Sequence, residues 1–163
     1  MAHKLNVYPE RCVGCRLCPV ACSMVKTGEC GLAAARIWVA HFGEESRYVP
    51  ITCTHCEDAW CIRACPAGAI TRRPGGHRTT IDDSRCVGCR ACTLACPFGA
   101  VVHHAASGKA IKCDECDGEP YCVGFCPTGA IAWEDEGAVQ HRRRLDTAQR
   151  LAAGADEPAA RGG

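Results

Sequence analysis

The stretch CVGCRACTLACPFGA, Cys86–Ala100, places four cysteines in fifteen residues and follows the last of them with proline. The same spacing, C-x2-C-x2-C-x3-C, occurs near the start of the chain, and two wider versions carry x4 or x5 before the third cysteine. Three of the four groups close with Cys-Pro-x-Gly-Ala, so the groups are internal repeats. They use every cysteine except Cys30: Cys12, Cys15, Cys18 and Cys22; Cys53, Cys56, Cys61 and Cys65; Cys86, Cys89, Cys92 and Cys96; Cys113, Cys116, Cys122 and Cys126.

The composition indicates that these cysteines supply structure. The chain has 163 residues and 17 cysteines, but only 3 Trp, 3 Tyr and 3 Phe for a core. So small a core needs metals or cross-links to offset the ordering entropy of the chain. The start, MAHKLNVYPERC, has neither the apolar run of a signal peptide nor a twin-arginine pair. We therefore expect a cytoplasmic protein whose cysteines stay reduced and bind metal instead of forming disulfides.

The sequence contains no pattern that indicates membrane insertion, nucleic-acid binding or catalysis. No stretch approaches the roughly 18 consecutive apolar residues of a membrane span. The net charge of +1 argues against a nucleic-acid-binding surface. There is no glycine-rich phosphate loop before a helix and no spacing that singles out Ser, His and Asp as a catalytic set. We therefore expect no catalytic residues in this chain.

The spacing of the groups favours iron–sulfur clusters over zinc. The run C-x2-C-x2-C-x3-C-P is an iron–sulfur signature in which the fourth cysteine binds the other cluster of a pair. The first three thiolates can surround one cubane, while the fourth lies on a short helical segment that leaves the loop. A structural zinc site uses two C-x2-C pairs and has no role for a third cysteine followed by a fourth and proline. The 16 motif cysteines therefore predict four 4Fe-4S clusters.

The segments between the groups indicate an α+β fold. Only three residues separate the third and fourth cysteines of each group, which is enough for one helical turn. Proline after the fourth cysteine ends that turn, and a glycine two residues later permits a reversal into a short strand. The expected strands are residues 5–8, 37–41, 48–52, 78–81, 100–103 and 130–133.

These motifs resemble the four-cluster, ferredoxin-like electron-transfer subunits of multisubunit oxidoreductases, such as the iron–sulfur subunits of dimethyl sulfoxide reductase and formate dehydrogenase. The resemblance covers residues 4–133 and includes the x4 spacing between Cys56 and Cys61. It implies two bacterial ferredoxin-like units of two 4Fe-4S clusters each, the second inserted into the first. Residues 1–49 and 101–133 would form the outer unit and residues 50–100 the inner unit. The first group departs from the pattern, because Ser23 follows Cys22 and its proline is Pro19.

The resemblance also implies how the motifs share clusters, the first pairing with the fourth and the second with the third. Each cluster would then take three cysteines from one motif and one from its partner. The implied iron-ligand sets are Cys12, Cys15, Cys18 and Cys126; Cys22, Cys113, Cys116 and Cys122; Cys53, Cys56, Cys61 and Cys96; and Cys65, Cys86, Cys89 and Cys92.

Several further residues lie close to the motifs. His55 lies inside the second cysteine loop, where it could tune a potential or replace a ligand; with four cysteines present, we favour a role beside the ligands or toward solvent. Positive charge on Lys112, His103 or His104 would raise a reduction potential, although solvated surface is an equally good interpretation. Cys30 is interpreted as a small thiol without a ligand role.

The tail, residues 134–163, contains no cysteine and begins with three acids that are followed by His141 and three arginines. Acids first and bases later complement a helix dipole, and Ala138, Leu145, Ala148 and Ala152 can share one face. We expect a helix near residues 137–153 that docks on the catalytic chain or on another copy of this chain, the latter giving head-to-tail association. The alternative is a solvated, frayed tail.

The expected function is to conduct single electrons through four clusters to or from the catalytic subunit of a cytoplasmic oxidoreductase. The short build resembles the small subunits of tungsten-pterin aldehyde oxidoreductase most, and then those of carbon monoxide dehydrogenase, formate dehydrogenase and hydrogenase. The expected partner is a tungsten- or molybdenum-pterin catalytic chain, with a flavin- or NAD-linked subunit or a ferredoxin as further partners. A free, diffusible polyferredoxin is the alternative. The near balance of 19 basic and 18 acidic residues argues against it, since diffusible ferredoxins tend to be acidic.

Overall fold

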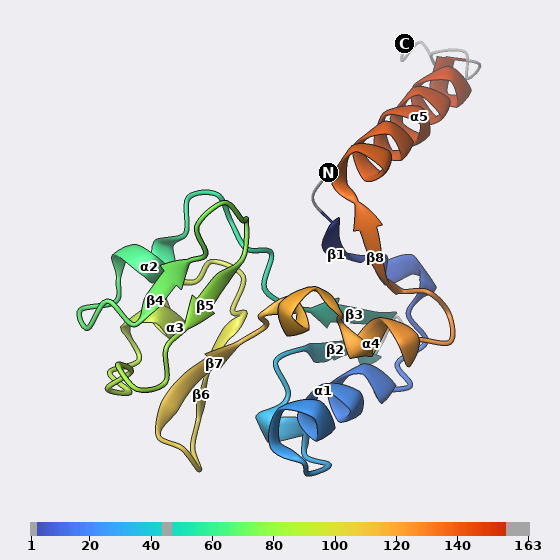
Figure 1. The fold of residues 1–163 in the computed structure, drawn as a ribbon. Coiled ribbons are helices and arrows are strands. Elements are labelled where there is room, and N and C mark those ends of the chain that lie inside the picture. The colour runs from blue at the N-terminus through green and yellow to red at the C-terminus, as the bar shows by residue number, and fades with distance from the viewer. Residues whose placement is uncertain (1–2, 44–46, 156–163) are drawn as a thin grey trace, which may run out of the picture.

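The computed structural model describes residues 3–43 and 47–155, which form two lobes and a long C-terminal helix (Figure 1). Each strand in these ranges pairs with one other strand in a two-stranded antiparallel sheet. The outer lobe contains the first part of the described chain together with residues 113–135, and the inner lobe contains the middle. This arrangement brings the first and fourth cysteine groups together and does the same for the second and third.

The outer lobe is organised around a sheet that joins the two ends of the chain, in which Leu5 lies opposite Trp133. Its helices α1 and α4 lie against each other, and a strand hairpin packs beside them (Figure 1). Its elements are β1 (His3–Val7), a 3-10 turn (Pro9–Arg11), α1 (Leu17–Thr27), a 3-10 turn (Leu32–Ala34), β2 (Trp38–Phe42), β3 (Arg47–Ile51), α4 (Tyr121–Gly124) and β8 (Ile131–Asp135).

The inner lobe consists of two hairpins and two short helices that contact each other. In the first hairpin Ile70 lies opposite Ile81, and in the second Val101 lies opposite Lys112. Its elements are α2 (Trp60–Arg63), β4 (Ile70–Arg72), β5 (Thr79–Ile81), α3 (Ala91–Ala95), β6 (Val101–His104) and β7 (Lys109–Lys112), and a 3-10 turn (Glu115–Gly118) leads back to the outer lobe.

Cysteines make up much of the core in both lobes. In the outer lobe Cys18, Cys22 and Cys122 pack with apolar side chains such as Ile37 and Ile131. In the inner lobe Cys61 and Cys92 pack with Ile70, Val101 and Ala110. A third cluster, of Cys53, Ala100 and Cys113, lies between the two and also contacts Leu5 and Cys96. The core is therefore continuous from one lobe to the other.

The structure differs from the sequence-based expectation at three elements. The first helix is 11 residues long instead of one turn, because Ser23 in place of proline lets it continue through Cys22 to Thr27. Strand β7 was not expected, since Lys-Ala-Ile-Lys is too short to show alternation, whereas β4 follows Gly68, where a reversal into a short strand was expected. The β6–β7 hairpin, expected in the outer unit, contributes Val101 and Ala110 to the inner core.

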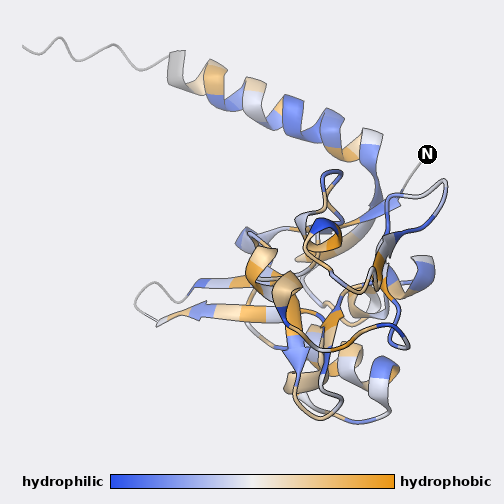
Figure 2. Ribbon diagram, turned by 90° about the vertical axis from the view of Figure 1, so that its left-hand side faces the viewer, coloured by the Kyte–Doolittle hydropathy of each residue, from blue (hydrophilic) through white to orange (hydrophobic). Residues whose placement is uncertain are grey.

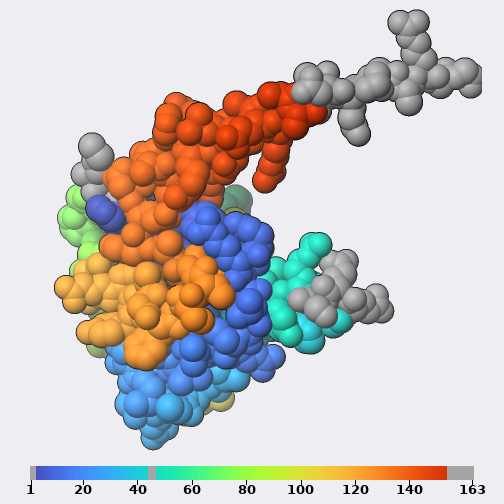
Figure 3. Space-filling view, turned by 90° about the vertical axis from the view of Figure 1, so that its right-hand side faces the viewer, coloured from blue at the N-terminus to red at the C-terminus, as the bar shows by residue number. Residues whose placement is uncertain are grey.

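The tail forms helix α5 (Glu136–Ala155), close to the range expected from its sequence. Arg142 binds Glu134 at 2.8 Å and also hydrogen-bonds the Tyr8 hydroxyl, while Lys4 binds Glu136 at 2.7 Å. Val139 is buried, but the described side chains after Arg142 are exposed. Figure 2 shows that this helix is largely hydrophilic, and Figure 3 shows it projecting from the body of the molecule.

Candidate iron-sulfur sites

Three pockets in the structure are each lined by four cysteines, three from one motif and one from another. Each contains about 330 to 360 Å³ of space free of protein atoms, part of it open to solvent. We name them site B (Cys22, Cys113, Cys116 and Cys122), site C (Cys53, Cys56, Cys61 and Cys96) and site D (Cys65, Cys86, Cys89 and Cys92).

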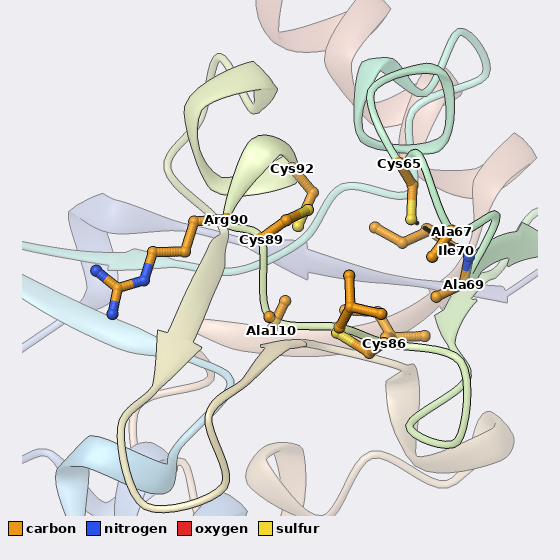
Figure 4. A pocket seen from close by; sticks show the side chains of 12 residues that line it. Cys65, Ala67, Ala69, Ile70, Cys86, Cys89, Arg90, Cys92 and Ala110 are labelled. Atoms are coloured by element: carbon orange, nitrogen blue, oxygen red, sulfur yellow. Dashed lines mark hydrogen bonds between the residues drawn. The ribbon is translucent and has the colours of Figure 1, made fainter.

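Site D illustrates the geometry that the three pockets share. Cys65 enters from the loop after α2, Cys86 and Cys89 come from the loop that leads into α3, and Cys92 lies in the first turn of α3 (Figure 4). The remaining wall is mostly apolar and includes Ala69, Ile70 and Ala110. One loop and the helix that follows it therefore supply three thiols to a small apolar pocket, and a separate segment supplies the fourth.

The remaining motif cysteines form a fourth set, site A (Cys12, Cys15, Cys18 and Cys126). Burial raises the pKa of Cys18 to about 12, with further contributions from Cys126, Cys12 and Cys15. These contributions place the four thiols within electrostatic range of one another. Across residues 3–43 and 47–155, no three His, Cys, Asp or Glu side chains converge tightly enough to hold a single metal ion.

The sites follow one another in the order A, B, C, D. Cys18 of site A and Cys22 of site B share the outer core, while Cys113 of site B packs with Cys53 of site C between the lobes. Cys61 of site C and Cys92 of site D share the inner core. Among the motif cysteines only Cys15 and Cys89 are exposed, and they belong to the two end sites.

Most of the buried thiols resist ionisation. Burial raises the pKa of Cys113 to about 11 and also raises the pKa values of Cys22, Cys61, Cys92 and Cys122. For Cys126 burial also acts to raise the pKa, but hydrogen bonds, led by the Ile131 amide, outweigh it and lower the pKa. Because a thiol binds metal as thiolate, metal binding at these sites releases protons.

Backbone amides point at several of these sulfur atoms. The N–H of Ala69 donates to Cys65 Sγ at 3.2 Å, and that of Arg36 donates to Cys22 Sγ at 3.3 Å. The N–H groups of His55 and Glu115 donate to Cys53 and Cys113, each at 3.4 Å. Amide hydrogen bonds to sulfur favour the thiolate and raise the reduction potential of a bound cluster. The thiol sets, the pocket sizes and these amides all fit 4Fe-4S clusters.

The third residue of the first C-x-x-C loop in each cysteine group has a left-handed backbone. Gly14 and Gly88 have φ of 72° and 69°, as expected for glycine. His55 and Glu115 occupy the same position in the loops of sites C and B, with φ of 49° and 55°. A non-glycine residue in this conformation is strained, and such strain is typical of functional positions.

The side chains of His55 and Glu115 are buried between sites B and C. Glu115 accepts hydrogen bonds from the Leu5 amide at 3.3 Å and from His77 Nε2 at 2.8 Å. His55 Nδ1 accepts from the Thr79 amide at 3.0 Å, so its other nitrogen carries the proton. Burial, followed by the charge of Lys112, lowers the pKa of His55 to about 3, and the ring is therefore neutral.

The polar residues singled out from the sequence have different environments in the structure. His55 is buried beside Cys53, to whose sulfur its backbone amide donates. Lys112 is buried, with only 2% of its surface exposed, so the solvated-surface interpretation is wrong. Cys30 is exposed, and His103 and His104 are partly exposed on β6. The buried role of Glu115 was not expected, although its place at the glycine position of a C-x-x-C loop was visible in the sequence.

The fold and the cysteine pockets define an iron–sulfur protein of the bacterial ferredoxin type. Residues 44–136 match the family described as "4Fe-4S dicluster domain", and residues 9–25 match the "4Fe-4S binding domain". The chain belongs to the 4Fe-4S dicluster family. Within the described residues, no helix is both long enough and apolar enough to cross a membrane.

Similar proteins include subunits of oxidoreductases. The chain is 34% identical to the B subunit of anaerobic dimethyl sulfoxide reductase of Escherichia coli over 153 residues, which cover 83% of this chain and 73% of that subunit. It is 36% identical to NADH-dependent phenylglyoxylate dehydrogenase subunit beta of Aromatoleum evansii over 127 residues, 76% of this chain but only 28% of that protein. A solved benzoyl-coenzyme A reductase complex, BamBC, matches with a TM-score of 0.49 and 26% identity over 82% of this chain and 75% of the matched one.

Proposed function

We propose that the protein is the electron-transfer subunit of an oxidoreductase complex and binds four 4Fe-4S clusters at sites A to D. The observation that supports this most is the set of three pockets, each lined by four cysteines from two motifs. Such clusters, when bound, supply one-electron exchange with little rearrangement. The protein's own residues hold the spacing, exclude water and direct amides at the sulfur atoms.

The proposed ligands are the four cysteines of each site, and the proposed domain arrangement is nested. The outer ferredoxin-like unit would hold sites A and B, and the inner unit, inserted into it, would hold sites C and D. Because the β6–β7 hairpin packs in the inner core, we draw the inner unit as residues 50–112. The outer unit then comprises residues 1–49 and 113–133, with α5 as an appendage.

The two end sites are the proposed points of entry and exit for electrons. Cys15 is exposed beside the exposed side chains of Val13 and Leu17 at site A. Cys89 is exposed close to the exposed Val87 at site D. Sites B and C have no exposed cysteine. An apolar surface around each end site suits the close approach that electron transfer between proteins requires.

We propose a catalytic chain as the main partner, and a tungsten-pterin aldehyde oxidoreductase as the first candidate because of the resemblance of the cysteine motifs. The named relatives belong to dimethyl sulfoxide reductase and phenylglyoxylate dehydrogenase, so catalytic chains of those types are further candidates, as are those of carbon monoxide dehydrogenase, formate dehydrogenase and hydrogenase. All 17 cysteines are free of disulfides, which fits a reducing compartment, and we place the complex in the cytoplasm.

Purification at native expression level tests this proposal against a free polyferredoxin. Elution together with a large cofactor-bearing chain supports a subunit, whereas a lone species of 17.4 kDa supports the diffusible alternative. Analysis of the co-purified fraction for tungsten, molybdenum and nickel then selects the class of catalytic chain. Tungsten supports the aldehyde oxidoreductase; molybdenum or nickel redirects the assignment to the other candidates.

A further inference from the structure

Lys112 is a buried cation at the boundary between the two lobes. It is the last residue of β7 and directly precedes Cys113, a cysteine of site B. Its Nζ donates to the Thr79 carbonyl oxygen at 2.5 Å and to the Cys113 carbonyl oxygen at 3.0 Å. Thr79, whose carbonyl oxygen accepts the first of these hydrogen bonds, lines the pocket of site C. Lys112 therefore lies between sites B and C.

The hydrogen bonds of Lys112 do not neutralise its charge. Both acceptors are backbone carbonyls, and no carboxylate of residues 3–43 or 47–155 forms a salt bridge with its Nζ. The nearby Glu115 carboxylate is bound by His77 and the Leu5 amide instead. A buried ammonium without a counter-charge is strongly unfavourable. In addition to the Glu115 carboxylate, the cysteines of sites B and C can supply negative charge on both sides of Lys112 as thiolates.

On the basis of the proposed function, we propose that the Lys112 ammonium is the fixed counter-charge shared by sites B and C and that it raises the reduction potentials of the clusters bound there. Reduction adds a negative charge to a site that four thiolates already make negative. A cation fixed beside the site stabilises the reduced form more than the oxidised form, so the potential rises. The same cation offsets repulsion between electrons on neighbouring sites of opposite lobes.

Lys112 Nζ donates its hydrogen bonds to carbonyl oxygens and to none of the motif sulfur atoms. Its proposed role is therefore to position the loop and to tune the cluster potentials through its charge. Its two carbonyl bonds tie β5 to the start of the site B loop, which is a structural role that a neutral donor can also perform. Charge is the property that separates the two roles. Lys109, on the same strand, provides a matched control because it is more exposed and donates to the Asp83 carbonyl oxygen at 2.6 Å.

The test is a redox titration of the full-length protein, followed by paramagnetic resonance, in wild type and in Lys112→Gln, Lys112→Met, Lys112→Arg and Lys109→Gln. Gln keeps a hydrogen-bond donor without charge, Met removes both, and Arg keeps the charge. In Lys112→Gln and Lys112→Met, we expect the reduced-to-oxidised ratio of the two central clusters to fall about tenfold at fixed potential, which is about 59 mV for a one-electron couple. Lys112→Arg and Lys109→Gln should match wild type.

Unchanged central potentials in Lys112→Gln or Lys112→Met, with iron content retained, would overturn the inference. If these two variants lose iron while Lys112→Arg keeps it, the charge is needed for assembly and the counter-charge role is supported. If Lys112→Arg also loses iron, side-chain shape and not charge is essential, and the inference fails. The wild-type titration tests the proposed function separately from the role of Lys112. Fewer than four clusters in wild type would contradict the proposed function, whatever the variants show.

Discussion

His55 and Glu115 occupy equivalent positions in two cysteine loops, and their side chains face each other with His55 Nε2 3.9 Å from Glu115 Oε1. The loops of the end sites have glycine at this position, so only the two central sites carry side chains there. These side chains fill the boundary between the lobes and contact His77 and Leu5. The two loops with strained backbones are thus the ones whose side chains meet where sites B and C adjoin.

The Glu115→Gly variant measures how much this junction contributes to stability. Glycine relieves left-handed strain of about 1–2 kcal/mol, but the variant loses two hydrogen bonds to a carboxylate, worth about 1.5–3 kcal/mol each. We therefore expect a net loss of about 3 kcal/mol in unfolding free energy, measured by denaturant unfolding of the cluster-loaded protein.

Asp117→Gly is the matched control for Glu115→Gly. Asp117 has φ of 60°, but its side chain is 63% exposed, and it pairs with Arg73 at the surface and, at 3.9 Å, with Arg78. The same strain is relieved there and only the ion pairs of an exposed side chain are lost, so the variant should be neutral or slightly stabilising. Equal destabilisation by the two variants would show that the contacts of Glu115 add nothing.

Gly88→Ala should disrupt site D, while Gly99→Ala should cost much less. Both glycines have positive φ, 69° and 61°, so the backbone strain is similar. A Cβ on Gly88 would overlap the Gly108 carbonyl oxygen, whereas a Cβ on Gly99 would meet no atom within 4 Å. We expect about 1 kcal/mol of destabilisation for Gly99→Ala and more than about 3 kcal/mol, with loss of iron, for Gly88→Ala. Similar stability and iron content in the two variants would contradict this account.

How much of this structure the sequence predicts depends on how local each feature is. The one-turn helices before Pro66, Pro97 and Pro127 follow from motif spacing and proline, and Ser23 explains why α1 is longer. The clustering of thiols from separate motifs came from resemblance to a family, because no local pattern states which loops meet. The burial of Lys112 and Glu115 could not be predicted from the sequence, since it depends on how the β6–β7 hairpin and the fourth cysteine loop pack between the lobes.

Anaerobically prepared protein should contain about sixteen irons and sixteen acid-labile sulfides per chain, four of each for every 4Fe-4S cluster. The physical reason is the donor count, because sites A to D together use 16 cysteines. Iron and sulfide assays, with zinc determined in the same sample, measure this directly. A plateau near eight irons, or stoichiometric zinc, would contradict the assignment of four clusters.

Cys96→Ser tests whether the fourth cysteine of a motif serves the neighbouring site. Cys96 lines site C with Cys53, Cys56 and Cys61, although its own motif supplies site D. We expect the paramagnetic signal of the site C cluster to change and that of site D to remain. Cys30→Ser, which alters an exposed cysteine outside the motifs, is the control and should leave all signals intact. A change confined to the site D signal would refute the nested assignment.

Helix α5 is the last feature with a testable role, because its described side chains after Arg142 are exposed. Its first two turns are fixed by Val139, Arg142 and Glu136, whereas Leu145 and Leu151 are 51% and 71% exposed. An isolated helix is marginal in water, so a docking partner, either the catalytic chain or another copy, would stabilise the distal turns.

Truncation after Asp135, which keeps β8 whole, should leave the iron content unchanged and weaken assembly, measured by light scattering and native mass. The full-length double variant Leu145→Gln and Leu151→Gln should weaken assembly in the same direction, because it removes the exposed apolar side chains and keeps the helix. If both proteins assemble as wild type does, α5 is solvated surface and the docking role is wrong.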